Sequence, residues 1–293
     1  MPNLNGNNST QRIGTVIVTF NNATMLRSLL EDLLSQTRKP DEIIVIDNAS
    51  SDDTEAMIKE YPHFRYIKFE ENLGSAGGYY EGLKTACENN DFVWTLDDDM
   101  SLNENALEVL ERWWYILEKN GQLGAVRSWV GHVPDLLDPI KINSFAWRGT
   151  FIKKEVIQDV GLPLKEYFLY AEDDEYGHRI TKKGYNMFFI PESQITEMRI
   201  EDKMIFNVWG KRRRLYKDKF RFYYAFRNQI DLYLRYKEFY NLIKTFSYAI
   251  KVIFLIIFLK HFKGIGIIKA VLDGIWDGLS SNLGKNQKYL PYL

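Results

Sequence analysis

The first hundred residues alternate between short apolar runs and amphipathic stretches. Ile13 to Phe20 is rich in β-branched residues and almost wholly apolar, which predicts a strand buried on both faces. Residues 24–36 predict a helix, because apolar side chains recur on one face: Met25, Leu29, Leu30, Leu33 and Leu34. Apolar runs at 42–47, 66–69 and 92–96 predict three more strands. This alternation predicts an open, mostly parallel α/β sheet.

Polar clusters follow the predicted strands. They lie at residues 19–22, 47–51, 72–78 and 97–99. In open α/β sheets, ligands bind outside the carboxyl ends of the strands. Four polar clusters at one edge therefore predict a ligand site there.

The cluster Asp97-Asp98-Asp99 directly follows an apolar run. Three consecutive carboxylates repel one another unless a cation is present, and Mg²⁺ or Mn²⁺ accepts oxygen ligands together with water and phosphates. Side chains alternate along an extended chain, so Asp97 and Asp99 are expected to face the same side. The alternative is a solvated acidic turn before the next helix.

Five motifs in a fixed order carry a family resemblance: VIVTFNN, EIIVIDNASSD, NLGSAGG, VWTLDDD and AEDDEYGHR. Over residues 12–235 the chain resembles the family 2 glycosyltransferases, which are inverting and have the GT-A fold. It is most similar to bacterial galactofuranosyltransferases and rhamnosyltransferases of cell-surface polysaccharides. The resemblance implies an α/β, Rossmann-like, open and mostly parallel sheet with a helical C-terminal extension.

The composition and the resemblance together divide the chain into four parts. The polar, Asn-rich residues 1–11 predict a disordered tail, and the resemblance implies a nucleotide-sugar-binding and catalytic domain over 12–200. Basic and aromatic helices on the acceptor side are expected over 201–239. Amphipathic, membrane-associating helices are expected over 240–293.

Five residues are implied to hold the base of the sugar donor. Thr19, Phe20 and Asn21 would lie near it. Asp47 would accept a hydrogen bond from a uracil or thymine ring nitrogen, with Asn48 beside it. An Asx turn without a ligand is the alternative interpretation of Asp47 and Asn48.

The diphosphate and the metal ion are implied to lie nearby. Asn72 and Gly77 would let the backbone approach the diphosphate, because glycine has no Cβ to obstruct it. Asp97 and Asp99 match the family's metal-binding carboxylates, for Mn²⁺ or Mg²⁺. Asp98 would contact the donor sugar or the ribose.

One position departs from the family pattern. The galactofuranosyltransferases usually carry a metal-ligating histidine a few residues after a proline, and this chain has Glu197 there. Glutamate is also a competent ligand for these ions. Either Glu197 binds the metal, or the site uses only Asp97, Asp99, phosphates and water.

The second acidic cluster, EDDE at residues 172–175, is implied to serve the acceptor. An acceptor hydroxyl is a poor nucleophile, so a carboxylate must take its proton. The resemblance places this base at Asp173 and an acceptor contact at Glu172. Trp147 would stack on a sugar ring or lie in the core, and Arg227 would contact an acceptor phosphate.

The C-terminal part combines positive charge with apolar stretches. The formal net charge of the whole chain is -1, and no reader motif accompanies the basic run at residues 211–214, so nucleic-acid binding is not expected. Lysines spaced among apolar residues over 240–283 predict helices lying in a membrane interface. A helical bundle or a dimer contact is the alternative. Cys87 is the only cysteine, which fits a reducing compartment. Together with the resemblance and the spaced lysines, this leads us to expect a peripheral protein on the cytoplasmic face of a bacterial membrane.

The resemblance therefore implies a metal-dependent inverting glycosyltransferase. It would transfer a sugar, foremost galactofuranose from UDP-galactofuranose, to a lipid-linked or growing surface polysaccharide. Transfer of rhamnose from dTDP-L-rhamnose is the first alternative. A catalytically silent subunit that only binds the nucleotide sugar is the alternative from another class.

Overall fold

The computed structural model describes most of the chain, namely residues 11–131, 138–198, 203–208, 211–216, 218–258 and 264–291. The predicted disordered tail over 1–11 lies, except for Gln11, outside the described residues.

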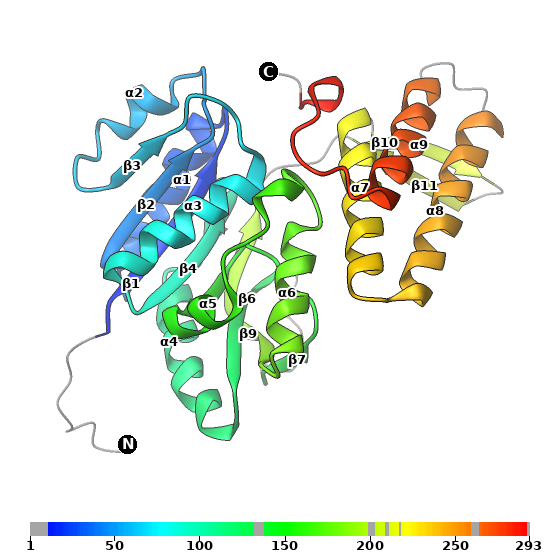
Figure 1. Cartoon of the computed structure of the whole chain (residues 1–293). Coiled ribbons are helices and arrows are strands. Elements are labelled where there is room, and N and C mark those ends of the chain that lie inside the picture. The colour runs from blue at the N-terminus through cyan, green and yellow to red at the C-terminus, as the bar shows by residue number, and fades with distance from the viewer. Residues whose placement is uncertain are drawn as a thin grey trace. The chain divides into compact units, whose positions relative to one another are not determined.

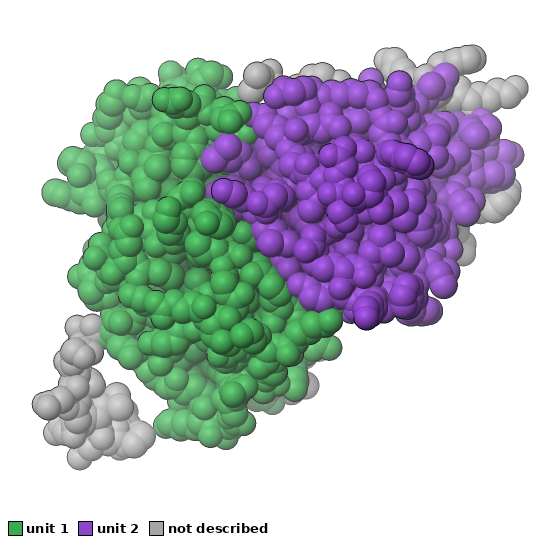
Figure 2. All heavy atoms as spheres, viewed as in Figure 1, with its two compact units in different colours: residues 1–72, 78–163, 176–199 green, residues 73–77, 164–175, 200–293 purple. Residues whose placement is uncertain are grey.

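The chain divides into two compact units (Figure 2). Unit 1 comprises residues 1–72, 78–163 and 176–199. Unit 2 comprises residues 73–77, 164–175 and 200–293. The short segments 73–77 and 164–175 thus group with the C-terminal part, which differs from the predicted division at residue 200.

A mixed sheet of nine strands forms the centre of unit 1, in the order β3-β2-β1-β4-β8-β6-β9-β5, with β7 paired to β9. Its strands are β1 (Ile13–Thr19), β2 (Glu42–Asp47), β3 (Arg65–Lys68), β4 (Phe92–Asp97), β5 (Met100–Leu102), β6 (Leu123–Val130), β7 (Ile140–Ile142), β8 (Thr150–Lys153) and β9 (Asn186–Glu197). β1 runs parallel to β2 and β4, and β2 runs parallel to β3. β8 pairs with β4 in the antiparallel direction. The carboxyl ends of β1, β2 and β4 therefore meet at one edge.

Helices accompany this sheet (Figure 1). They are α1 (Ala23–Ser35), α2 (Thr54–Ile58), α3 (Gly74–Asn89), α4 (Ala106–Leu117), α5 (Lys154–Val160) and α6 (Glu172–Lys182), with 3₁₀ turns η1 (Glu118–Asn120) and η2 (Lys165–Tyr167). α3 packs closely on the sheet, since a Cβ at Gly82 would collide with Val16. α1 buries Leu26 rather than the predicted Leu34, which is 43% exposed.

β9 contains a proline, and the strand continues through Pro191 to Glu197. The pairing of β9 with β6 shifts register between Ile190 and Gln194. A bulge of this kind accommodates a proline, which cannot donate to the ladder.

Unit 2 contains a hairpin and three helices. Its elements are β10 (Lys203–Val208), β11 (Lys211–Tyr216), α7 (Lys219–Arg235), α8 (Phe239–Phe258), α9 (Ile265–Leu279) and the 3₁₀ turn η4 (Gln287–Tyr289). The prediction of helices throughout 201–239 is wrong at its start, because residues 203–208 and 211–216 pair as antiparallel strands. α9 approaches α7 closely, since a Cβ at Gly274 or Gly278 would meet the α7 backbone.

α8 is the one helix in the described part of the chain that is long and apolar enough to cross a membrane by length and composition. Its buried side chains include Ala249, Val252, Leu255 and Ile256, which pack with α7 and α9. A helix in the core of a water-soluble protein satisfies the same criterion.

Candidate active site

The ends of β1 and β4 are joined by Asp98. Its Oδ2 accepts hydrogen bonds from the Thr19 hydroxyl at 2.7 Å and from the Phe20 N–H at 3.3 Å. Asp98 is 8% exposed and forms a turn with Asp99 directly after β4. The structure thus brings the predicted residues Thr19, Phe20 and Asp98 together, with Asp98 fixing the edge of the sheet.

The ends of β1 and β2 are joined by Asn21. It has a left-handed backbone (φ +50°), and its Oδ1 accepts a hydrogen bond from the Ser51 N–H at 2.8 Å. Its own N–H donates to the Ser50 hydroxyl at 2.9 Å. The Asn48 N–H donates to the Thr19 carbonyl at 2.9 Å. Asn21 and Asn48 therefore lie side by side at the predicted edge.

Asp47 behaves as the Asx-turn interpretation predicted. The side chain is fully buried, and its Oδ1 accepts the Ser50 N–H at 2.7 Å. Its Oδ2 accepts the Tyr66 hydroxyl at 2.5 Å, and burial together with this bond raises the pKa of Tyr66. Both oxygens therefore take part in ordering this turn, and the contact with a donor ring nitrogen stays a prediction.

Asp97 closes β4 and contacts a stack of aromatic rings. The Tyr79 hydroxyl donates to Asp97 Oδ1 at 2.7 Å. The Tyr79 ring stacks on Trp147 with 4.5 Å between centroids, and Phe145 and Tyr176 pack against the same indole. Trp147 is 4% exposed, so its core interpretation is confirmed and its faces are not open to a sugar ring.

Two arginines lie near Asp97 that the sequence analysis did not assign to the donor. Burial raises the pKa of Asp97, while the Tyr79 hydroxyl and the charges of Arg148 and Arg127 partly offset this effect. The Arg127 Nε donates to the Arg148 carbonyl at 3.2 Å. In the sequence, the only indication of a role for either arginine was that Arg148 directly follows Trp147.

The predicted metal-binding trio is not assembled in this structure. Among the residues described, no group of three or more His, Cys, Asp or Glu side chains is arranged to hold a metal ion. Glu197 forms an ion pair with Arg148 at 2.8 Å. Glu197 is therefore paired with an arginine here, and its role as a metal ligand stays a prediction. Two carboxylates of the acidic turn, Asp97 and Asp99, still provide the hard oxygen donors that a divalent cation prefers.

The glycine-rich segment belongs to a helix rather than to a loop. α3 begins at Gly74, directly after Asn72 and Leu73, so Gly77 lies in its first turn. Gly74 has a positive φ of 72°, and a Cβ there would collide with the Phe168 carbonyl. A Cβ at Gly77 would meet Leu73. Within unit 2 these glycines therefore permit close backbone packing.

The second acidic cluster forms the first turn of α6 (Glu172–Lys182). Glu172 is 4% exposed, and the Ser75 hydroxyl donates to its Oε1. This burial does not support the acceptor contact predicted for Glu172. Asp173 is partly exposed, and its Oδ1 accepts the Asp174 N–H at 2.8 Å.

Arg227 does not lie where an acceptor phosphate could reach it. The side chain is 0% exposed in the interior of unit 2. Its guanidinium donates to the carbonyls of Gly284 at 2.5 Å and Tyr167 at 2.9 Å. The predicted contact of Arg227 with an acceptor phosphate is therefore wrong, because the donors of this group are directed to the backbone.

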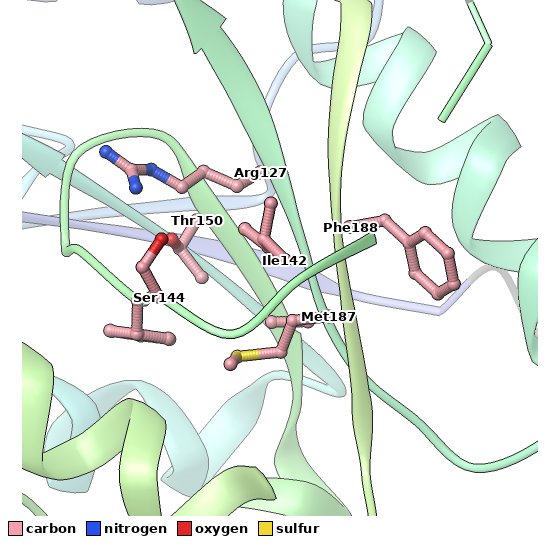
Figure 3. Close-up of a pocket in the computed structure, with 8 residues that line it drawn as sticks. Arg127, Ile142, Ser144, Thr150, Met187 and Phe188 are labelled. Carbon is pink, nitrogen blue, oxygen red and sulfur yellow. The ribbon is translucent and has the colours of Figure 1, made fainter. Parts of the chain in front are cut away.

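A narrow hollow lies between strands of unit 1 (Figure 3). It is lined by Ala125, Arg127, Ile142, Ser144, Phe145, Thr150, Met187 and Phe188. The Arg127 side chain extends away from Phe188 toward the neighbouring loop. The hollow is mostly apolar and has no room for a water molecule, so it is not a nucleotide site.

The family model described as glycosyl transferase family 2 matches residues 15–153. Just under half of the chain is thus similar to the family 2 glycosyltransferases. This stretch includes β1 to β4 and the turn of Asp97 to Asp99, and thus the hydrogen-bonded edge described above.

Proteins of known activity match parts of the chain. It is 34% identical over 92 residues to "Galactofuranosyltransferase GlfT1" of Mycolicibacterium smegmatis, a match that covers 31% of the chain and 30% of that protein. It is 29% identical over 177 residues to "Poly-beta-1,6-N-acetyl-D-glucosamine synthase" of Staphylococcus epidermidis, covering 51% of the chain and 41% of that protein. The chain thus spans less than half the length of these curated relatives.

A solved structure confirms the predicted fold class. The crystal structure of GalNAc-T7 with UDP, GalNAc and Mn²⁺ aligns with a TM-score of 0.62 at 13% identity, covering 78% of the chain and 48% of that protein. At this identity the likeness concerns the fold alone. The open, mostly parallel sheet and the helical C-terminal region predicted from the sequence are both present.

Proposed function

We propose that this glycosyltransferase transfers galactofuranose from UDP-galactofuranose to a lipid-linked or growing surface polysaccharide of a bacterium, with inversion. The observation that carries the proposal is the hydrogen-bonded edge formed by the ends of β1, β2 and β4 within the family 2 match. The galactofuranosyltransferase relative supports the choice of donor, and the polysaccharide synthase supports the choice of acceptor class.

On the donor side, we assign the nucleobase of the donor to the polar edge at Thr19, Phe20, Asn21 and Asn48. Asp47 orders the turn that follows β2 at this edge. The diphosphate carries negative charge, and Arg148 is a cation whose charge acts on Asp97 at this edge. We assign Arg148 to the diphosphate, because an arginine can donate two parallel hydrogen bonds to a phosphate group.

A divalent cation fits two groups of this edge. Asp97 is a carboxylate whose charged form is disfavoured by burial, and a cation relieves that cost. We propose that Asp97 and Asp99 hold Mn²⁺ or Mg²⁺ together with the donor's diphosphate oxygens and water. When bound, such an ion offsets the charge that develops on the leaving diphosphate.

On the acceptor side, Asp173 is the proposed general base. The acceptor hydroxyl oxygen attacks the anomeric carbon as the bond from that carbon to the diphosphate oxygen breaks. The hydroxyl proton passes to the Asp173 carboxylate, and attack from the face opposite the diphosphate inverts the configuration. Unlike its buried neighbour Glu172, Asp173 is partly exposed and so within reach of an acceptor.

The test of the proposed function is release of nucleoside diphosphate by the purified full chain. UDP-galactofuranose and dTDP-L-rhamnose are supplied separately with a lipid-linked glycan acceptor, in Mn²⁺, in Mg²⁺ and in EDTA. We expect release from UDP-galactofuranose only, and we expect EDTA to suppress it. Release from dTDP-L-rhamnose would show that the donor is dTDP-L-rhamnose and not UDP-galactofuranose. Binding of UDP without release from either donor would instead support a silent subunit.

A membrane surface is the proposed partner of unit 2. Apolar side chains on one stripe of α8 are largely exposed, with Ile243 at 63%, Ile250 at 70% and Ile257 at 63%, and Trp276 of α9 is 74% exposed. Exposed lysines, Lys244, Lys251 and Lys269, lie among them. Apolar side chains edged by lysines suit the interface of an anionic bilayer, where the lysines reach the headgroups. We therefore propose peripheral binding to the cytoplasmic face of the membrane.

Replacing Ile250 with glutamate is expected to weaken binding to vesicles of phosphatidylglycerol by about 10- to 100-fold, since burying one such side chain contributes about 1.5–3 kcal/mol. The measurement is co-sedimentation of the full chain with vesicles. The matched control is Leu34→Glu, because Leu34 is an exposed apolar residue of unit 1. Equal binding of Ile250→Glu and the unchanged chain would remove α8 from the proposed interface.

A further inference from the structure

The segment that leads into α6 has an uncommon backbone. Three of its non-glycine residues are left-handed: Phe168 (φ +64°), Tyr170 (φ +65°) and Ala171 (φ +61°). Bulky residues rarely adopt this conformation, and it persists only where the surroundings determine it. α6 begins at the next residue, Glu172, so the angles of this segment set the position of Asp173.

Asn228 of α7 holds the carbonyls of this segment. It is fully buried, and its Nδ2 lies 2.9 Å from the Tyr167 carbonyl oxygen, 2.8 Å from that of Leu169 and 2.7 Å from that of Tyr170. Its Oδ1 accepts the Arg227 Nε–H at 2.8 Å, which determines that the amide nitrogen faces the carbonyls. One side chain thus meets three carbonyls of a turn whose backbone is left-handed.

Arg227 and Asp231 of the same helix also bind this segment. The Arg227 guanidinium donates to the Tyr167 carbonyl, and the ring of Tyr224 lies 4.7 Å below it. Asp231 is 2% exposed and accepts the Tyr167 hydroxyl at 2.8 Å and the Ser281 hydroxyl at 2.8 Å. Burying such groups is costly unless they are paired, and all three are paired with this segment.

The start of α6 is held from two further sides within unit 2. The Ser75 hydroxyl donates to Glu172, and the Tyr236 hydroxyl donates to Glu175 Oε1 at 2.7 Å. The Ala76 N–H donates to the Phe168 carbonyl at 3.1 Å. Glu172 and Glu175 in this first turn are therefore fixed, while Asp173 between them stays partly exposed.

We propose that Arg227, Asn228 and Asp231 are positioning residues for transfer. They hold segment 166–171 in the conformation that presents Asp173 at the start of α6. This inference rests on the proposed function, in which Asp173 takes the acceptor proton. It replaces the phosphate contact predicted for Arg227 with an indirect role in turnover.

Asn228→Asp tests the inference in the full chain, because it keeps the shape of the side chain and replaces the donating nitrogen with oxygen. We expect faster amide hydrogen exchange over residues 167–175. Turnover (kcat) should fall by about 100-fold, the size of effect that a misplaced catalytic group produces. The Kd for UDP should stay within about threefold, because the residues proposed to bind the base are in unit 1.

Tyr223→Phe is the matched control, since it removes a buried hydroxyl on the same helix that donates to Asp277 rather than to segment 166–171. It is expected to lower the thermal midpoint with little change in kcat. Tyr167→Phe is the milder variant if Asn228→Asp does not fold, and it should lower kcat several-fold by releasing Asp231 from the segment.

Two results would overturn the inference. One is unchanged exchange and unchanged kcat in the Asn228 or Tyr167 variant. The other is faster exchange with a kcat no lower than that of Tyr223→Phe, since the conformation of the segment would then be irrelevant to turnover. Asp173→Asn, assayed in parallel, separates failure of the proposed function from failure of the positioning role. Normal transfer by that variant rejects Asp173 as the base. The exchange data still report whether α7 orders segment 166–171.

Discussion

Asp173→Asn is expected to lower kcat for transfer by about 10²–10⁴, the contribution typical of a positioned general base. Asparagine keeps the size of the side chain and can still accept the Asp174 N–H, as Asp173 Oδ1 does at 2.8 Å. It cannot take a proton from the acceptor hydroxyl. The measurement is the initial rate of UDP release from UDP-galactofuranose in the presence of acceptor, together with the Kd for UDP.

Asp174→Asn is the control for Asp173→Asn. The two residues are adjacent in the first turn of α6, and both carry a negative charge that the helix dipole favours there. Loss of that favourable charge should affect both variants alike, so only the loss of a proton acceptor distinguishes them. If Asp173→Asn keeps more than about a tenth of the activity while Asp174→Asn loses it, the base is Asp174.

The sequence predicted the sheet because its signal is local. Runs such as residues 13–19 and 42–47 are apolar throughout and end at polar clusters, and both became buried parallel strands. The edge was predicted for the same reason: carboxyl ends of parallel strands meet wherever such strands pair. The hydrogen bond from Thr19 to Asp98, whose positions differ by 79, is the outcome of that pairing.

The individual roles at the edge were harder to predict, because partners distant in sequence decide them. Asp47 accepts the Tyr66 hydroxyl, and Glu197 pairs with Arg148. Neither partner carries a local signal. Trp147 was ambiguous because an indole beside a sheet edge suits both a sugar and a core, and the ring of Tyr79 decided for the core.

Unit 2 was predicted least well, and the reason is physical. Arg227 and Asn228 are polar residues in an aromatic helix, a pattern that resembles a binding surface when the sequence is considered alone. They are buried because segment 166–171 is left-handed and directs several carbonyls toward them. That backbone conformation involves no glycine at Phe168, Tyr170 or Ala171, so the usual sequence signal for a positive φ is missing.

Asp97→Asn is expected to change activity and stability in opposite directions. Transfer should fall by about 10²–10³, because a charged ligand of the proposed cation is lost where charge develops on the leaving group. Burial raises the pKa of Asp97 above that of the unfolded chain, so at neutral pH its ionised form lowers the stability of the metal-free protein. Asparagine is neutral and still accepts the Tyr79 hydroxyl. The thermal midpoint in EDTA should therefore equal or exceed that of the unchanged chain.

Asp98→Asn is the matched comparison for Asp97→Asn, because the two carboxylates are adjacent but have different partners. Asp98 accepts from the Thr19 hydroxyl and the Phe20 N–H, so neutralising it weakens bonds that join β1 to β4, and its thermal midpoint should fall. Calorimetric titration with UDP in Mn²⁺ and in EDTA completes the measurement. We expect Mn²⁺ to strengthen UDP binding by the unchanged chain and to have little effect on Asp97→Asn. If Asp97→Asn is destabilised like Asp98→Asn yet still binds UDP more tightly in Mn²⁺, then Asp97 supports the sheet edge and the cation is held elsewhere.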